Sequence, residues 1–294
     1  MSALVLALNP SIDAEWRVED VIWEEKNNVQ TERRWAGGKG INVARWLKHL
    51  GGKPELFLPL GGVTGDELAG YLREERISTS IIPLAGPTRV NVIITTGAGR
   101  QMRFNPLGPR LTKPEWKIIV ERVESRLGQG SLLILSGSLP RGVPLNAYAN
   151  LITRARKHGV RTLLDCDGDV LIASIPSRPF LVKPNEHELA RWFGRPLCTE
   201  KNVVCAARAL SEKTRGWVFV SRGAGASLLL NVQEQFQAFA KPARVKPRNT
   251  VGAGDALLAG VARQIQLGVP PSDWLEYGLT VGTRATQCLP GHVS

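Results

Sequence analysis

Short apolar runs alternate with longer stretches of helical periodicity along most of the chain. The apolar runs predict buried strands at residues 2–8, 55–59, 132–136, 161–165, 180–183 and 217–221. The periodic stretches predict helices at residues 65–75, 113–126, 146–158, 185–193 and 201–211. A strand followed by a helix, repeated, predicts an α/β fold in which helices cover both faces of a mostly parallel central sheet. Ligands of such sheets bind at the carboxyl ends of the strands, so functional residues are expected there.

Two stretches interrupt this alternation, at residues 13–35 and 87–104. They are rich in Val, Ile, Thr and Trp in partial alternation with polar residues, and Gly97 and Gly99 suit a hairpin turn. We therefore predict a small antiparallel sheet beside an α/β core, the core consisting of residues 1–12, 36–86 and 105–294.

A glycine-rich turn at residues 249–254 leads into Asp255 and an apolar helix. Glycines allow successive backbone N–H groups to point into one concavity, and the helix dipole adds positive potential, so the turn can bind a phosphoryl group. We expect the dipole to keep Asp255 ionised in the first helical turn. A carboxylate there can accept the proton of a hydroxyl that attacks the phosphoryl group. The alternative is a plain glycine-rich loop before a core helix.

A second glycine cluster at residues 36–40 opens an amphipathic helix that ends at Gly51. It is not a phosphate-binding Walker A loop, because Arg33 and Gly40 occupy the positions of that motif's first glycine and its Ser or Thr. Asn42 in the first turn offers both a donor and an acceptor to a polyol. A plain helix start is the alternative interpretation.

Together, the two motifs resemble the signatures of the PfkB-type, ribokinase-like carbohydrate kinases. Four other segments resemble family segments in the family's order, at residues 8–13, 136–140, 181–188 and 220–225. The most similar branch phosphorylates phosphosugars and includes minor-type 6-phosphofructokinases, tagatose-6-phosphate kinases and 1-phosphofructokinases. The resemblance implies a ribokinase-like three-layer sandwich with a small β-sheet lid over the sugar. In some members the outer face of this lid forms a homodimer.

The resemblance also implies roles for individual residues. Asp255 matches the catalytic base, and the anion hole that receives the transferring phosphoryl group matches Gly252, Ala253 and Gly254. ATP would be bound by residues that line the nucleotide in similar proteins: Lys183, Asn185, Glu188, Ser221, Gly223 and Thr250. Asn185 and Glu188 would also order Mg²⁺ indirectly. The hydroxyls of the sugar would be held by Asp13, Gly38, Asn42 and Ser138.

A sugar that already carries a phosphate brings negative charge, which cationic side chains can recognise. The positions that resemble phosphate-binding residues of the phosphosugar branch are Lys26, Lys39, Arg89 and Arg103. We therefore expect ATP- and Mg²⁺-dependent phosphorylation of a primary hydroxyl of a ketohexose phosphate. Fructose 6-phosphate and tagatose 6-phosphate are the first candidates and fructose 1-phosphate is the next. A free-sugar or nucleoside kinase of the same family is the alternative.

Composition narrows the remaining choices. The 294 residues carry a formal net charge of +12, which could indicate a nucleic-acid-binding protein without kinase activity. The cations are dispersed rather than clustered, so a basic surface that attracts anionic metabolites is favoured and no nucleic-acid partner is expected. No apolar run approaches the roughly 18 residues of a membrane span, and no signal peptide precedes the first strand, so a cytoplasmic protein is expected.

Candidate metal sites are weak. The cysteines, Cys166, Cys198, Cys205 and Cys288, show no metal-ligand spacing, and we expect reduced thiols. Residues 165–169 begin like a calcium loop, but the glycine comes too early and Pro176 occupies the position of the bidentate glutamate. We interpret this segment as the end of a strand and a turn.

Overall fold

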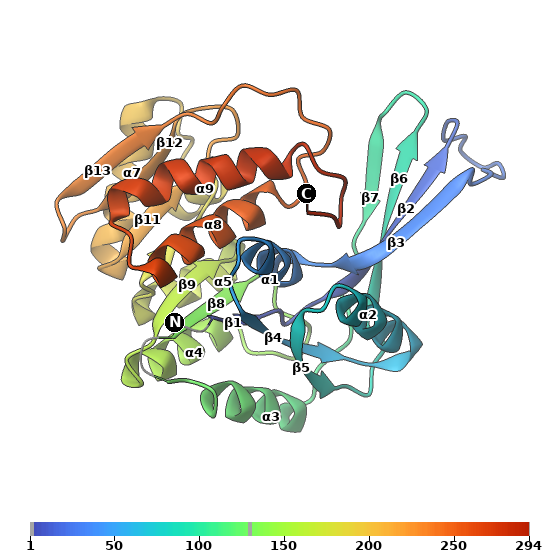
Figure 1. Cartoon of the computed structure of the whole chain (residues 1–294), viewed down its shortest axis with the longest axis horizontal. Helices are drawn as coiled ribbons and strands as arrows, with labels where there is room; N and C mark the ends of the chain where they lie inside the picture. The colour runs from blue at the N-terminus through green and yellow to red at the C-terminus, as the bar shows by residue number, and fades with distance from the viewer. Residues whose placement is uncertain (1–2, 129–130, 294) are drawn as a thin grey trace.

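The computed structural model describes residues 3–128 and 131–293, and it contains one large and one small sheet (Figure 1). In the described residues the large sheet has the strand order β13-β12-β11-β10-β9-β8-β1-β4-β5. Its strands are β1 (Ala3–Leu6), β4 (Pro54–Leu60), β5 (Ser78–Pro83), β8 (Leu132–Ser136), β9 (Arg161–Asp165), β10 (Leu181–Val182), β11 (Trp217–Val220), β12 (Ser227–Asn231) and β13 (Phe236–Ala240). Neighbours from β5 to β11 are parallel, whereas β12 and β13 add antiparallel pairs. The predicted mostly parallel α/β fold is confirmed.

Helices cover both faces of this sheet because neighbouring residues of each strand point to opposite sides. Val5 of β1 packs into one apolar core and Leu6 into the other. The first core contains residues of α1 (Lys39–His49), α2 (Gly62–Glu74), α8 (Ala253–Leu267) and α9 (Pro271–Ala285). The second contains residues of α3 (Lys113–Glu124), α4 (Ala147–Lys157), α5 (Gly168–Ser174), α6 (Glu186–Phe193) and α7 (Glu200–Thr214). A short 3-10 helix, Ile175–Ser177, follows α5.

The small sheet, called the lid below, projects from one edge of the core (Figure 1). It consists of β2 (Ser11–Val18), β3 (Thr31–Gly37), β6 (Arg89–Thr96) and β7 (Gln101–Phe104), in the order β3-β2-β6-β7. The β2–β6 pair at its centre is parallel, so the prediction of a purely antiparallel sheet was wrong in this pair. Both strands leave the core in the same direction after a core strand, which makes their pairing parallel.

The part of the chain that the structure describes contains no helix long and apolar enough to cross a membrane. All four cysteines are free, and Cys166 and Cys288 are buried. The carboxyl ends of the parallel strands lie along one side of the large sheet, where the first turns of α1 and α8 and residues of the lid also meet. This arrangement brings together segments that are far apart in the sequence.

Candidate active site

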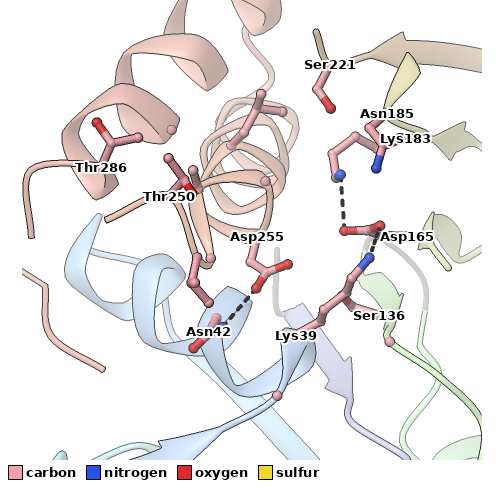
Figure 2. A pocket seen from close by; sticks show the side chains of 18 of the residues that line it. Lys39, Asn42, Ser136, Asp165, Lys183, Asn185, Ser221, Thr250, Asp255 and Thr286 are labelled. Atoms are coloured by element: carbon pink, nitrogen blue, oxygen red, sulfur yellow. Dashed lines mark hydrogen bonds and ion pairs between the residues drawn. The ribbon is translucent and has the colours of Figure 1, made fainter. Parts of the chain in front are cut away.

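A cavity of about 1450 Å³ lies on this side of the sheet, between the lid and the carboxyl ends of the strands. Asn9 follows β1, Ser136 and Asp165 end β8 and β9, and Lys183 follows β10. The first turns of α1 and α8 contribute Lys39 and Asp255. Figure 2 shows the side chains of Lys39, Lys183 and Asp165 pointing toward one another, with Asp255 beside them. The expectation that functional residues gather at the strand ends therefore holds for this cavity.

Asp255 lies in the first turn of α8 and is 6% exposed. The helix starts at Ala253 because Gly252 adopts a left-handed conformation, with φ 79°, that glycine tolerates best. Asn42 Nδ2 donates a hydrogen bond of 2.9 Å to Asp255 Oδ2. Burial raises the pKa of Asp255 to about 6, and the negative charge of Asp165 acts in the same direction. From the sequence, the helix dipole was expected to keep this carboxylate ionised. Burial and the charge of Asp165 work against ionisation, so the pKa is raised instead.

Asp165 joins two lysines from different parts of the chain. Its Oδ1 is 3.0 Å from Lys39 Nζ and its Oδ2 is 3.2 Å from Lys183 Nζ (Figure 2). Burial would raise the pKa of Asp165, but Lys183 and Lys39 outweigh it and hold the pKa below its usual value. In turn, the charge of Asp165 raises the pKa of Lys39, which stays protonated. The strand end predicted at Asp165 is confirmed, but Asp165 was not predicted as a residue of the site.

Lys39 was expected to bind the phosphate of the substrate, and in the structure it lines the cavity and pairs with the buried Asp165. Besides Asp165, its Nζ is 3.9 Å from Glu188 Oε1. Lys183 is buried, and its Nζ lies 3.5 Å from the position that a Cβ at Gly254 would occupy. Lys183 therefore lies beside the turn that was predicted to bind the transferring phosphoryl group, and the charge of Asp255, which follows that turn, acts on Lys39.

Asn185 and Glu188 form a capping box at the start of α6. Glu188 N donates to Asn185 Oδ1, and Asn185 N donates to Glu188 Oε2, each over 2.8 Å. This pairing leaves Glu188 Oε1 for other partners. In the described residues no group of three or more His, Cys, Asp or Glu could hold a metal ion. Mg²⁺ is usually bound by one or two carboxylates together with substrate phosphates and water, and Glu188 Oε1 is a carboxylate oxygen at this cavity.

The lid side of the cavity is lined by polar side chains. Asp13 Oδ1 accepts hydrogen bonds from Ser11 Oγ at 2.9 Å and Asn91 Nδ2 at 2.8 Å. Burial raises the pKa of Asp13. A Cβ on Gly37 would lie only 2.2 Å from Asp13 Cγ, so glycine is required where β3 passes this side chain. The predicted residues Gly38 and Asn42 also line the cavity.

The four cations expected at the substrate phosphate do not share one environment. Arg89 and Arg103 line the cavity, whereas Lys26 lies in the exposed β2–β3 loop and does not. Arg89 Nη1 and Nη2 donate 3.0 Å hydrogen bonds to Pro106 O and Asn9 O, and Arg103 Nη2 donates to Gln101 Oε1. The loop between β2 and β3 carries Lys26 beyond the strands, so its role at the substrate phosphate stays a prediction.

Asn9 is a further residue of this region that the sequence analysis did not single out. Asn9 Nδ2 donates to Ser138 Oγ at 3.1 Å, which places the predicted Ser138 at the cavity. Asn9 Oδ1, Arg89 Nε and Asn91 Oδ1 are buried and have no hydrogen-bond partner in the described residues. Such unpartnered atoms are costly to bury, so a polar ligand in the cavity would stabilise them.

The opposite end of the cavity contains the predicted nucleotide residues Ser221, Gly223 and Thr250. Gly223 has a φ of 55°, in the left-handed region. Arg244 from the loop after β13 and Thr286 at the end of α9 also line this end, and neither was predicted. Their elements, β13 and α9, were not recognised in the sequence.

Comparisons with known proteins show the family to which the chain belongs. The family model described as pfkB family carbohydrate kinase matches residues 6–290. The 1-phosphofructokinase of Bacillus subtilis (strain 168) is 33% identical over 280 residues, which cover 95% of this chain and 90% of the relative. The ATP-dependent 6-phosphofructokinase isozyme 2 of Escherichia coli (strain K12) is 32% identical over 284 residues, with 96% and 91% covered.

The solved structures lead to the same family. The crystal structure of the phosphofructokinase-2 from Escherichia coli in complex with potassium has a TM-score of 0.92 and 31% sequence identity. The comparison covers 99% of this chain and 94% of that chain, so the core and the lid both match. The expected ribokinase-like fold is confirmed. The chain therefore belongs to the pfkB family of carbohydrate kinases and is a phosphotransferase that transfers phosphate to an alcohol group.

Proposed function

We propose that this chain transfers the γ-phosphoryl group of ATP, with Mg²⁺, to the free primary hydroxyl of a ketohexose monophosphate. One observation carries the proposal. The buried carboxylate of Asp255 lies between a lid region with unpartnered polar atoms and a pair of lysines bound to Asp165. An acceptor hydroxyl on the lid side and a phosphoryl group on the lysine side would both be next to Asp255.

The chain's own groups account for most of the chemistry. Asn42 occupies Asp255 Oδ2, which leaves Oδ1 to accept the proton of the attacking hydroxyl. The backbone N–H groups in the first turn of α8 and the ammonium groups of Lys39 and Lys183 would stabilise charge on the transferring phosphoryl group. Mg²⁺, when bound, supplies neutralisation of the phosphate charge, and Glu188 and Asn185 would orient its water shell. The lid excludes water from the reacting groups.

The phosphate already on the acceptor is assigned to Arg89 and Arg103. A guanidinium can bind two phosphate oxygens at once, and Arg89 Nε is buried without a partner in the described residues. The sequence favoured fructose 6-phosphate or tagatose 6-phosphate, with fructose 1-phosphate next. The relatives include 1-phosphofructokinases at 33% and 36% identity and a 6-phosphofructokinase at 32%, so both fructose phosphates stay candidates.

The deciding experiment measures ADP release by the purified protein with ATP, Mg²⁺ and a panel of acceptors. The panel contains fructose 1-phosphate, fructose 6-phosphate, tagatose 6-phosphate, fructose, ribose and adenosine. We expect the highest kcat/KM for a ketohexose phosphate, with a bisphosphate as the product. A preference for fructose, ribose or adenosine over every sugar phosphate would contradict the proposal and favour the free-sugar or nucleoside alternative. No ADP release with any acceptor would instead favour the nucleic-acid-binding alternative without kinase activity.

The lid is also proposed to form the contact of a homodimer. Ile22, Trp23 and Val29 in and near its β2–β3 loop are exposed, and Trp23 is 76% exposed. Large exposed apolar side chains that lie close together mark interaction surfaces. Light scattering would show a dimer for the wild type, and Trp23→Ser should shift the equilibrium toward the monomer.

A further inference from the structure

Arg45 lies one helical turn after Asn42 on α1 and faces away from the large cavity. Its side chain is 5% exposed and does not line that cavity, so it has no direct access to the substrates. Arg45 Nη1 donates a 2.9 Å hydrogen bond to Asn42 Oδ1. The amide of Asn42 is therefore held on one side by Arg45 and on the other by Asp255.

The two ends of this amide are chemically different, and Arg45 selects between them. A guanidinium has only donors, so it binds the amide oxygen and turns the NH₂ group toward Asp255. A flipped amide would place its oxygen against the carboxylate of Asp255 and its NH₂ group against the guanidinium. Both contacts would then be repulsive, so the orientation of Asn42 follows from the charge signs of its two neighbours.

The guanidinium itself is fixed by other elements. Arg45 Nε and Nη2 bind the two carboxylate oxygens of Glu75 at 2.6 and 2.7 Å, and Nη2 also donates to Ala36 O at 2.8 Å. Glu75 is the C-terminal cap of α2, and Ala36 belongs to lid strand β3. The end of α2, the root of the lid and the first turns of α1 therefore meet at one side chain that cannot rotate freely.

We propose that Arg45 is a positioning residue for phosphoryl transfer: it fixes the amide of Asn42, which holds Asp255 Oδ2 and directs Oδ1 to the acceptor hydroxyl. This inference rests on the proposed role of Asp255 as the base. Arg45 does not line the large cavity, and Asn42 is the cavity residue to which it donates a hydrogen bond, so its effect on Asp255 passes through Asn42.

The charged groups around Asp255 and Arg45 determine how the loss of Arg45 would change the pKa of Asp255. Asp255 is faced by Asp165 from β9, Lys39 from α1 and Lys183 after β10, and none of these contacts Arg45. Arg45 is faced by Glu75 and by Asp13 of the lid. Burial raises the pKa of Asp255, and the hydrogen bond from Asn42 opposes this effect. A freely turning Asn42 would lose that bond part of the time, so the pKa of Asp255 would rise further.

The test compares Arg45→Met, Arg45→Lys and wild type in full pH profiles of kcat and kcat/KM. Arg45→Met should lower kcat about tenfold and move the acid limb to higher pH, while the KM for ATP changes less than about twofold. Arg45→Lys should recover part of the loss, because an ammonium still donates to the amide oxygen but cannot bind Glu75 through two nitrogens.

Arg34→Met is the matched control. Arg34 also binds a glutamate of α2 through two nitrogens, with Nε 2.7 Å and Nη2 2.9 Å from the oxygens of Glu67, but it does not contact Asn42. It should lose a similar amount of thermal stability without moving the acid limb. If Arg45→Met does not fold, Arg45→Met/Glu75→Gln removes the unpaired carboxylate and allows the same measurement.

A double-mutant cycle separates positioning from general destabilisation. In an Asn42→Ala background, Arg45→Met should change neither kcat nor the acid limb further, because the group through which it acts is gone. An unchanged kcat and acid limb in Arg45→Met, an acid limb that also moves in Arg34→Met, or full additivity with Asn42→Ala would overturn the inference. Failure of the proposed base would show separately, as activity retained by Asp255→Asn.

Discussion

Replacement of Asp255 by asparagine should separate the catalytic use of this buried carboxylate from its cost to the folded state. The new amide keeps the size of the side chain but cannot accept the proton of the attacking hydroxyl. We expect turnover to fall by about two orders of magnitude or more, with nearly unchanged ATP binding. The same substitution should make the protein more stable at neutral pH. Few other substitutions that lower activity would also stabilise the fold.

The magnitude follows from the pKa of the buried group. The pKa of Asp255 is raised from 3.8 to about 6, mainly by burial, so the folded state binds this proton more tightly than the unfolded chain does. Stability therefore falls as the pH rises from about 4 to about 6, and the full cost is present above that range. The difference corresponds to at most about 3 kcal/mol at pH 7, or roughly 5 °C in Tm for a chain of this size.

The assay is a set of thermal unfolding curves for wild type and Asp255→Asn between pH 4 and pH 8, together with ADP release at pH 7.5. The gain in Tm should be largest above pH 6 and should vanish near pH 4. Asp273 provides the matched control, because it is also the third residue of its helix, α9, but is exposed. Asp273→Asn should change neither activity nor the pH dependence of Tm. Equal Tm values at pH 7 and a turnover above half of wild type would refute the reasoning.

Three further variants test the remaining parts of the site. Gly254→Val places a branched side chain where a Cβ would already lie 3.5 Å from Lys183 Nζ, so activity should be abolished while circular dichroism stays that of the wild type. Retained activity would mean that the turn is only structural. Glu188→Gln should raise the Mg²⁺ concentration for half-maximal activity, because one carboxylate charge near the metal is lost; an unchanged dependence would leave Glu188 with its capping role alone. Arg89→Ala should raise the KM for the hexose phosphate about tenfold or more, because a lost charge-assisted hydrogen bond costs about 1.5 to 3 kcal/mol, and Arg89→Lys should recover only part of it. If the KM for the sugar phosphate stays the same, Arg89 does not bind the phosphate.

The central part of the fold could be predicted because local patterns determine it. The predicted strands at 132–136 and 161–165 coincide with β8 and β9, whose residues are buried almost throughout; β8 has four consecutive apolar residues, and β9 has two leucines at its centre. The helix predicted at 113–126 begins at the same residue as α3, where Thr112 and Glu115 form a capping box. Such signals need no information about distant segments.

Other elements lack a local signal of this kind. The strand β5 was missed because its burial pattern is mostly exposed, as expected for a strand at the edge of a sheet. The strand β13 has no fully buried residue and also lies at an edge. The parallel pairing of β2 with β6 depends on the direction in which both leave the core, and no periodicity within either strand records that direction.

In the candidate site, too, the sequence reveals contiguous motifs but not the contacts between distant residues. The two glycine motifs and the segment around Asn185 were found because each is contiguous in the sequence. The contacts that link these motifs are not contiguous: Asn42 and Asp255 are separated by 213 positions, and Lys39 and Asp165 by 126. Asp165 at a strand end looks like an ordinary turn residue until the fold brings two lysines to it. The orientation of Asn42 likewise depends on Arg45, which reads in the sequence only as a cation within a helix.

The burial of Asp255 has a functional reason that the sequence motif does not reveal. An ordinary aspartate, with a pKa near 3.8, is a weak base at neutral pH. A pKa of about 6 makes the carboxylate a stronger base while it remains mostly ionised near pH 7, the compromise expected of an efficient general base. Burial and the charge of Asp165 raise the pKa, whereas Lys39, Asn42 and Lys183 oppose the rise. In the proposed role of Asp255 as the base, these neighbours keep its pKa below neutral pH, and the buried charge that destabilises the fold would give the acceptor hydroxyl a base able to take its proton.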